Sequence, residues 1–143
     1  MRVSRYIAEF LKGKVDYVFG LQGGAVVHLF DACERFGPKP IYCHHEQAAG
    51  YAASGYQRIH GYAACILTTG PGCTNAITPL LGAWQDSIPC LFISGQQASS
   101  RLSYGKKVRQ VGAQEAPICE IVRPITKWAD WVRDAADLKM QLA

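Results

Sequence analysis

The chain has 143 residues, the size of one domain, and 49% of them are hydrophobic, which is enough to bury a core without disulfides or metal. Its net charge of +4 comes from 15 basic and 11 acidic residues that are interspersed, so nothing indicates a nucleic-acid partner. No apolar run approaches the roughly 20 residues that cross a bilayer, and charged residues interrupt the first segment before a signal sequence forms. We therefore expect no membrane span and no secretion.

Six cysteines occur at irregular spacings, with no Cys-x-x-Cys pair and no zinc-finger arrangement of cysteine and histidine. Most lie inside apolar runs, as Cys65 and Cys90 do, where a reduced cysteine acts as a small hydrophobic residue. This pattern is typical of a reducing compartment, and it predicts a cytoplasmic protein.

Short apolar runs alternate along the chain with longer segments of helical character, which is the pattern of strand and helix units that form a parallel sheet. The sequence therefore predicts an α/β fold, a doubly wound parallel sheet with helices on both faces, in one domain over residues 1–143. In chain order we predict helix 4–12, strand 16–19, helix 25–36, strand 40–43, helix 46–60, strand 63–68, a helix that ends near Asp86, strand 89–94, a polar loop 95–112, a short helix 116–122, strand 125–128 and a helix from about Asp134.

The predicted helix 46–60 is rich in alanine and glycine. Small side chains let one face of a helix approach another backbone closely. We therefore expect tight packing there, within the chain or across a subunit boundary. The three tryptophans are expected in the core or at an interface rather than as stacking platforms; they are Trp84, Trp128 and Trp131.

Three segments that follow predicted strands contain the residues best suited to bind a ligand. They are Gly20 to Gly24, His44 to Gln47 and Thr68 to Asn75. In an open parallel sheet such turns meet outside the carboxyl ends of the strands, where ligands bind. Glycine there lets a ring or a phosphate lie against backbone N–H groups, because no β-carbon intervenes. Neither a dinucleotide-binding Gly-x-Gly-x-x-Gly motif nor a P-loop is present, so the sequence does not support either kind of nucleotide site.

Each of these segments also has a plainer interpretation. Glu46 is an acid in the first turn of a helix, where the helix dipole stabilises a negative charge by about 0.3–1 kcal/mol, and its position alone does not exclude that role. His44 and His45 are candidate metal ligands, but adjacent side chains in an extended segment point in opposite directions, which favours a structural role for at least one. The turn at 69–72 is suited both to start a helix with proline and to cradle a cofactor.

Four strings of residues, in order and in register, resemble a known family. They are HEQAAGYAA at 45–53, TGPGCTN at 69–75, DSIP at 86–89 and ISGQ at 93–96. Over residues 4–128 the chain resembles the N-terminal, pyrimidine-binding domain of thiamine diphosphate enzymes of the acetolactate synthase type. The segments 108–115 and 124–127 also stand where this family has its active-site loop and the stretch that follows it.

The resemblance implies a catalytic role for Glu46. In this family the glutamate hydrogen-bonds a ring nitrogen of the cofactor's aminopyrimidine, which promotes removal of the proton between the sulfur and nitrogen of the thiazolium ring. The activated cofactor then attacks and decarboxylates a 2-keto acid such as pyruvate. Carried over residue by residue, the resemblance implies that Glu46 and Gln114 are catalytic and that the cofactor-binding residues are Gly23, Gly24, Glu46, Thr69, Pro71, Gly72 and Asn75.

The loop that leads to Gln114 departs from the family pattern. Acetolactate synthases usually have an aromatic residue where Ala113 stands, and this difference leaves the second substrate open. Lys106, Lys107 and Arg109 are suited to meet an acidic substrate, the phosphates of FAD or a partner chain, although a solvated loop is the simpler interpretation. FAD is therefore an optional cofactor in this prediction.

Enzymes of this family hold the diphosphate through Mg²⁺ on a second domain with a Gly-Asp-Gly segment, which this chain lacks. The resemblance therefore implies a diphosphate-binding domain in the same or another chain, and a homo-oligomer, either a dimer or a tetramer. We also expect the domain to lack its last strand. The isolated chain is then expected to be inactive and to bind the cofactor weakly, because the metal and diphosphate contacts are missing.

Within this interpretation the expected activity is that of a transferase or lyase. Carboligation to acetolactate in branched-chain amino acid biosynthesis is favoured, with decarboxylase, oxidase and carbon–carbon hydrolase chemistry as alternatives. A rival from another class is a non-catalytic, truncated or regulatory binding module with the same fold, since a fold does not determine a function. A flavodoxin-like cofactor carrier ranks last, because no phosphate loop is recognisable.

Overall fold

Four parallel strands form the centre of the molecule in a computed structural model that describes residues 1–142. The strands are Tyr17–Gly20 (β1), Lys39–Tyr42 (β2), Ala64–Leu67 (β3) and Leu91–Ser94 (β4), in the order β2-β1-β3-β4. Tyr42 and Ile66 both lie opposite Gly20, so the strands end together at one edge of the sheet.

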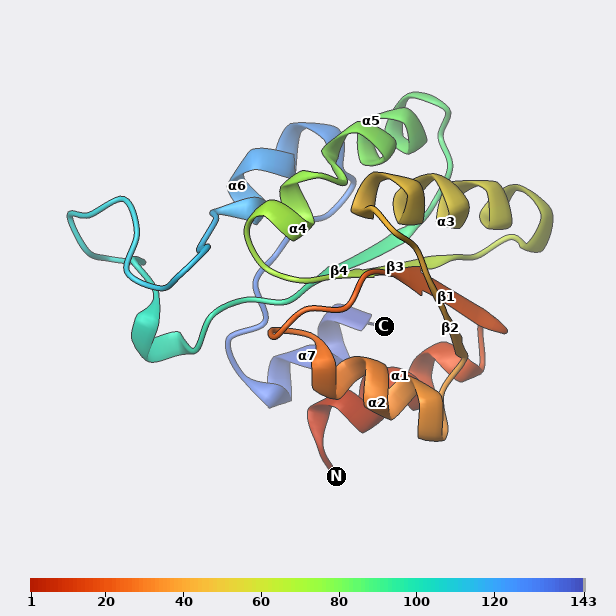
Figure 1. Cartoon of the computed structure of the whole chain (residues 1–143), viewed down its shortest axis with the longest axis horizontal. Coiled ribbons are helices and arrows are strands. Elements are labelled where there is room, and N and C mark those ends of the chain that lie inside the picture. The colour runs from red at the N-terminus through yellow and green to blue at the C-terminus, as the bar shows by residue number, and fades with distance from the viewer. Residues whose placement is uncertain (143) are drawn as a thin grey trace.

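Helices cover both faces of this sheet (Figure 1). One face carries α1 (Val3–Lys12), α2 (Val27–Phe36) and α7 (Ala135–Leu142), and the other carries α3 (Glu46–His60), α4 (Pro71–Thr74), α5 (Ile77–Gln85) and α6 (Ile118–Val122). Two short 3-10 helices are η1 (Ser99–Arg101) and η2 (Arg123–Ile125). The predicted doubly wound α/β fold is therefore confirmed.

The strands bury side chains on both faces, as a covered parallel sheet requires. The core beneath α1 and α2 includes Leu11, Val18, Phe30 and Ile66, and the core beneath α3 includes Phe19, Ala49, Ala53, Cys65 and Leu67. Burial raises the pKa of the Cys33 thiol to about 11 and also raises the pKa of Cys65. All six cysteines are free, and these two act as small hydrophobic core residues, as predicted.

Helix α3 packs closely on α5 because a glycine stands at their contact. A β-carbon on Gly50 would lie 2.5 Å from Pro79 Cγ, which is closer than real side chains approach. Elsewhere on the same helix there is free space, since no atom lies within 4 Å of the place where Gly55 would carry its β-carbon. The close packing predicted for residues 46–60 is therefore found within this chain.

Residues 125–128 were predicted as a strand, and this prediction is wrong. The segment begins at the end of η2, in which Pro124 occupies one of the first positions and has no N–H group to donate to a sheet. The Thr126 hydroxyl donates to the Val122 carbonyl at 3.0 Å, which ties the end of η2 to α6 instead of to a sheet. Trp128 follows with 71% of its surface exposed, so it is not a core residue within this chain.

The single helix predicted after the 69–72 turn is divided into α4 and α5. The Ala76 N–H donates to the Cys73 carbonyl at 3.2 Å, a bond three residues back that tightens the turn and ends α4. Trp84 on α5 is 48% exposed, so of the two positions expected for it, core or interface, only the interface remains.

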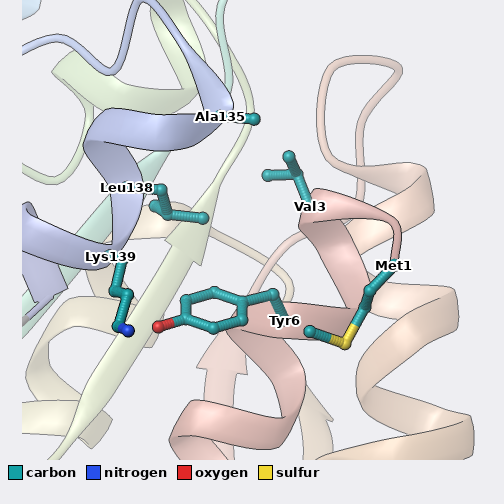
Figure 2. A pocket seen from close by; sticks show the side chains of 6 residues that line it. All are labelled: Met1, Val3, Tyr6, Ala135, Leu138 and Lys139. Atoms are coloured by element: carbon teal, nitrogen blue, oxygen red, sulfur yellow. The ribbon is translucent and has the colours of Figure 1, made fainter.

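The last helix, α7, lies beside the start of α1. Side chains of the two segments line a shallow cavity of about 150 Å³, and Figure 2 shows them: Met1, Val3, Tyr6, Ala135, Leu138 and Lys139. None of the predicted site residues contributes to this cavity. Within residues 1–142 there is no helix with the length and apolar character to span a bilayer.

Candidate functional site

The direction of the chain across the sheet reverses between β1 and β3. After β1 the chain passes through α2 to β2 on one side, and after β2 it returns through α3 to β3 on the other side. Ligands bind at such a switch point in open α/β sheets. A β-carbon on Gly23 would overlap the Thr68 side chain, so the turns after β1 and β3 touch and only glycine fits at 23.

Glu46 begins α3 at this edge of the sheet, and its side chain is largely buried. Its exposed fraction is only 9%, although it stands in the first turn of a helix. Asn75, directly after α4, donates its side-chain amide to Glu46 Oε2 at 3.0 Å. Oε1 has no hydrogen bond within residues 1–142, and no fully buried side-chain oxygen in that range lacks a partner, so Oε1 is accessible. One oxygen is therefore oriented by the protein, and the other is free to meet a ligand.

The turn after β3 brings two more predicted residues to Glu46. A β-carbon on Gly72 would lie 2.5 Å from Thr68 Cγ2, so glycine lets this turn pack against Thr68, and the same point lies 3.5 Å from Glu46 Oε1, which places Gly72 next to the carboxyl group. Pro71 begins α4, and its carbonyl accepts the Asn75 backbone N–H at 3.0 Å. This bond places Asn75 one helical turn after Pro71, within reach of Glu46.

Thr68, against which Gly72 packs, also lines a polar cavity of about 370 Å³. The cavity is lined by Gly24, Ala25, Thr68, Thr69, Gln96, Gln97, Ala98 and Gln114. Thr69 Oγ1 donates to Gln96 Oε1 at 2.9 Å, and the Gln96 amide donates to the Ala116 carbonyl at 3.1 Å. The lining offers hydroxyl and amide groups without a charged side chain, which suits neutral hydrogen bonds to a ligand.

Gln114 reaches the cavity through an unusual backbone conformation. Its φ of 58° lies in the left-handed region, which residues other than glycine rarely adopt. The Gln114 carbonyl accepts from Thr69 Oγ1 at 3.4 Å, and a β-carbon on Gly70 would overlap that carbonyl. Gly70 itself has a φ of 59°, so both the conformation and the close contact require glycine there.

The structure thus brings the predicted site residues into two adjacent groups. The first contains Glu46, Pro71, Gly72 and Asn75, and the second, around the cavity, contains Gly24, Thr69 and Gln114, with Gly23 against Thr68 between them. Thr68 lies in a segment that the sequence marked as suited to bind a ligand, but neither it nor Gln96 and Gln97 was assigned a role in the site. The signal that identifies these residues is position, since they lie within a few residues of the carboxyl ends of β3 and β4.

His45 has the structural role that was expected for at least one of the two histidines. Its Nδ1 accepts the Gln47 backbone N–H at 3.1 Å and so caps α3, while His44 and His45 are both exposed. The part of the chain that the structure describes holds no group of three or more histidine, cysteine, aspartate or glutamate residues arranged to bind a metal ion.

The basic residues of the long loop are solvated. Lys106, Lys107 and Arg109 are all exposed, and none of them forms a salt bridge within residues 1–142. These observations agree with the simpler of the two interpretations offered for this stretch.

Comparisons with known proteins agree with this geometry. The model of the family "Thiamine pyrophosphate enzyme, N-terminal TPP binding domain" matches residues 1–118. The chain is 42% identical over 130 residues to the acetolactate synthase large subunit of Haemophilus influenzae, covering 90% of this chain and 22% of that protein. It is 41% identical over 134 residues to the mitochondrial acetolactate synthase of Schizosaccharomyces pombe, covering 92% of this chain and 19% of that protein. It is 40% identical over 138 residues to the acetolactate synthase large subunit of Lactococcus lactis, covering 94% of this chain and 23% of that protein.

This chain spans about a fifth of the length of these relatives. The family match nevertheless covers most of the chain, and it includes the turns after β1, β2 and β3 that form the site. The chain therefore belongs to the family of N-terminal TPP-binding domains of thiamine pyrophosphate enzymes.

Proposed function

We propose that this chain forms the pyrimidine-binding side of a thiamine diphosphate site, with Glu46 as its catalytic acid. The observation that supports this most strongly is the Glu46 carboxyl group, which is buried at the switch point with Oε2 held by Asn75 and Oε1 accessible. The surroundings fit a flat aromatic ligand, because Gly24 leaves the backbone uncovered and the adjacent cavity is polar without charge.

Thiamine diphosphate, when bound, supplies a thiazolium carbon that adds to a carbonyl group and accepts the electron pair left by decarboxylation. In our proposal Glu46 Oε1 holds a proton and shares it with a ring nitrogen of the aminopyrimidine. Asn75 assists by donating to Oε2, which fixes the plane of the carboxyl group. Gly72 assists by letting the turn after β3 pack against Thr68 next to the carboxyl group.

Gln114 and the cavity that it lines are the proposed place of the substrate. A 2-keto acid carries a carbonyl and a carboxylate, which need hydrogen-bond donors. The Gln114 side-chain amide and the second N–H of the Gln96 and Gln97 amides are the donors proposed to bind them, since the Thr69 hydroxyl already donates to Gln96. The proposed activity is of the acetolactate synthase type, a transferase or lyase reaction in branched-chain amino acid biosynthesis. The names of the relatives support it. The identity of the second substrate is left open by Ala113.

The remaining parts of the proposal concern partners. The diphosphate and its Mg²⁺ are assigned to another domain, in the same or another chain, and the isolated 143-residue domain is expected to be inactive. We further propose a cytoplasmic homo-oligomer, a dimer or tetramer, with FAD as an optional ligand of the basic loop around Lys106, Lys107 and Arg109.

Titration calorimetry of the chain assembled with a diphosphate-binding domain tests this proposal. We expect thiamine diphosphate with Mg²⁺ to bind the wild-type assembly, and Glu46→Gln to weaken binding by at least about tenfold, since a charge-assisted hydrogen bond contributes about 1.5–3 kcal/mol. Glu120→Gln is the matched control, because Glu120 is also an acid in the first turn of a helix but is exposed.

Two results decide between the enzyme and its rival. Acetolactate or another product of 2-keto acid decarboxylation, identified after incubation with pyruvate, would support the enzyme. Absence of cofactor binding by the wild-type assembly, with Mg²⁺ and the partner domain supplied, would contradict the proposal and favour a non-catalytic binding module.

A further inference from the structure

The carboxyl group of Glu115 forms hydrogen bonds with several residues of the long segment between β4 and α6. Glu115 Oε1 accepts from the backbone N–H of Ser103 and from the Ser103 hydroxyl, both at 2.7 Å. Its other oxygen, Oε2, accepts the backbone N–H groups of Val111 at 3.0 Å and Gly112 at 3.4 Å. Four donors from three residues therefore converge on one side chain and draw the 103–112 stretch back onto residue 115.

These donors are all neutral, although basic side chains stand in the same stretch. Lys106, Lys107 and Arg109 form no salt bridge with Glu115 in the described residues. A carboxylate that is held by several backbone N–H groups acts as an internal anion around which the loop is built. Because both oxygens already have donors, Glu115 is suited to hold the loop rather than to take a proton from a substrate.

Further hydrogen bonds fix the residues just before Gln114. The Gln97 side-chain amide donates to the Ala113 carbonyl at 2.6 Å, and the Gln110 side-chain amide donates to the Gly112 carbonyl at 2.8 Å. A β-carbon on Gly112 would lie 2.7 Å from Gln97 Cγ, so this part of the loop is closely packed. The peptides at 112 and 113 are thus held by Glu115 from one side and by Gln97 from the other.

Gln114 lies between this anchored stretch and the turn after β3. A left-handed, non-glycine residue persists only where its surroundings hold it, and the carbonyl of Gln114 abuts Gly70. We infer that Glu115 is a positioning residue, which fixes the Gln114 peptide against Gly70 and so sets where the Gln114 side chain meets the polar cavity. The consequence for catalysis rests on the proposed function, whereas the structural effect does not.

The ionisation of Glu115 is consistent with this role. Its pKa is lowered to about 2, first by the backbone hydrogen bond from Val111 and next by that from Ser103. The carboxylate form therefore makes these bonds at neutral pH.

Glu115→Gln tests the inference, with amide hydrogen exchange and backbone NMR shifts measured in the full chain. Glutamine keeps the size of the side chain and one oxygen acceptor, but its NH₂ group cannot accept from Val111 and Gly112. We expect exchange at residues 111–114 to become at least about tenfold faster and the resonances of Gln114 and Gly70 to shift, with the sheet unchanged. Glu120→Gln, which removes an exposed acid, should match the wild type.

A second measurement separates positioning from loop stability. In the assembled holoenzyme, Glu115→Gln should lower kcat/KM for the 2-keto acid about tenfold while leaving thiamine diphosphate affinity unchanged. Unaltered exchange at 111–114 would overturn the inference, and so would faster exchange with unshifted Gln114 and Gly70. If the wild-type assembly bound no cofactor while Glu115→Gln still displaced Gln114, the proposed function would fail and the positioning role would stand.

Discussion

Glu46 and Glu120 are both acids in the first turn of a helix, but their surroundings differ. Glu120 is exposed, whereas Glu46 is largely buried and receives a hydrogen bond from Asn75. A helix dipole needs no such burial to stabilise a carboxylate. The burial and orientation of its carboxyl group therefore support the role that we propose for Glu46.

The first prediction concerns Asn75. We expect Asn75→Ala to slow proton exchange at the thiazolium carbon of bound cofactor by about tenfold, because Glu46 loses the donor that orients its carboxyl plane. The melting temperature should change little, since Asn75 is an exposed residue. Thr74→Ala is the control, because the Thr74 hydroxyl bonds only to a carbonyl of its own short helix. An exchange rate equal to that of the wild type would contradict the role given to Asn75.

The sequence was sufficient to propose Glu46 and the glycine turns, because these residues stand in strings that follow strand ends, and the resemblance added Gln114. It was not sufficient to show which of these residues contact one another. The bond from Asn75 to Glu46 joins residues 29 positions apart, and the left-handed Gln114 depends on contact with Gly70. Such contacts arise from tertiary packing, which no local pattern encodes.

Elements in the sheet region were predictable because each strand is a short apolar run and the longer helices have an apolar face. Strand β3 is buried at every position, and helix α3 runs over the predicted residues 46–60. The 125–128 stretch was misassigned because its apolar and β-branched residues suit a strand, whereas Pro124 and the Thr126 hydroxyl bond produce a turn. The hydrogen bonds of Glu115 were also missed, since their donors are mostly backbone N–H groups.

The packing of α3 on α5 gives the second prediction, a pair of glycine substitutions in one helix. Gly50→Ala should lower the free energy of unfolding by roughly 1–3 kcal/mol, because its β-carbon meets Pro79. Gly55→Ala should raise it by about 0.5–1 kcal/mol, since the site is open and alanine favours a helix. Urea unfolding monitored by circular dichroism measures both, and equal effects of the two substitutions would contradict the described packing.

The third prediction concerns the loop around Glu115 and its dependence on pH. Because the pKa of Glu115 is lowered from 4.5 to about 2, its contribution to loop stability is fully present above pH 4.5 and is lost as the pH falls from there through about 2. The NMR shifts of the Val111 and Gly112 amides should therefore stay constant down to roughly pH 3.5. A titration of these shifts centred near pH 4.5 would show that the hydrogen bonds do not hold the carboxylate.

The molecule combines a covered parallel sheet with a proposed site at one edge of it. Its switch point lies between β1 and β3, and residues that follow all four strands meet there, including Gly24, Glu46, Thr68 and Gln96. The chain spans about a fifth of the length of its relatives, and we assign the metal and the diphosphate to another domain. In this account the present domain contributes the acid that meets the aminopyrimidine.

Proton exchange at the thiazolium carbon of thiamine diphosphate, followed by NMR in deuterated buffer, tests this account most directly. With the assembled protein we expect Glu46→Gln to slow exchange by at least about 100-fold, because the glutamine amide cannot hold and share the proton. Glu120→Gln should leave the rate unchanged. Exchange at the wild-type rate in the Glu46→Gln assembly, with the cofactor shown to be bound, would contradict the catalytic role of Glu46.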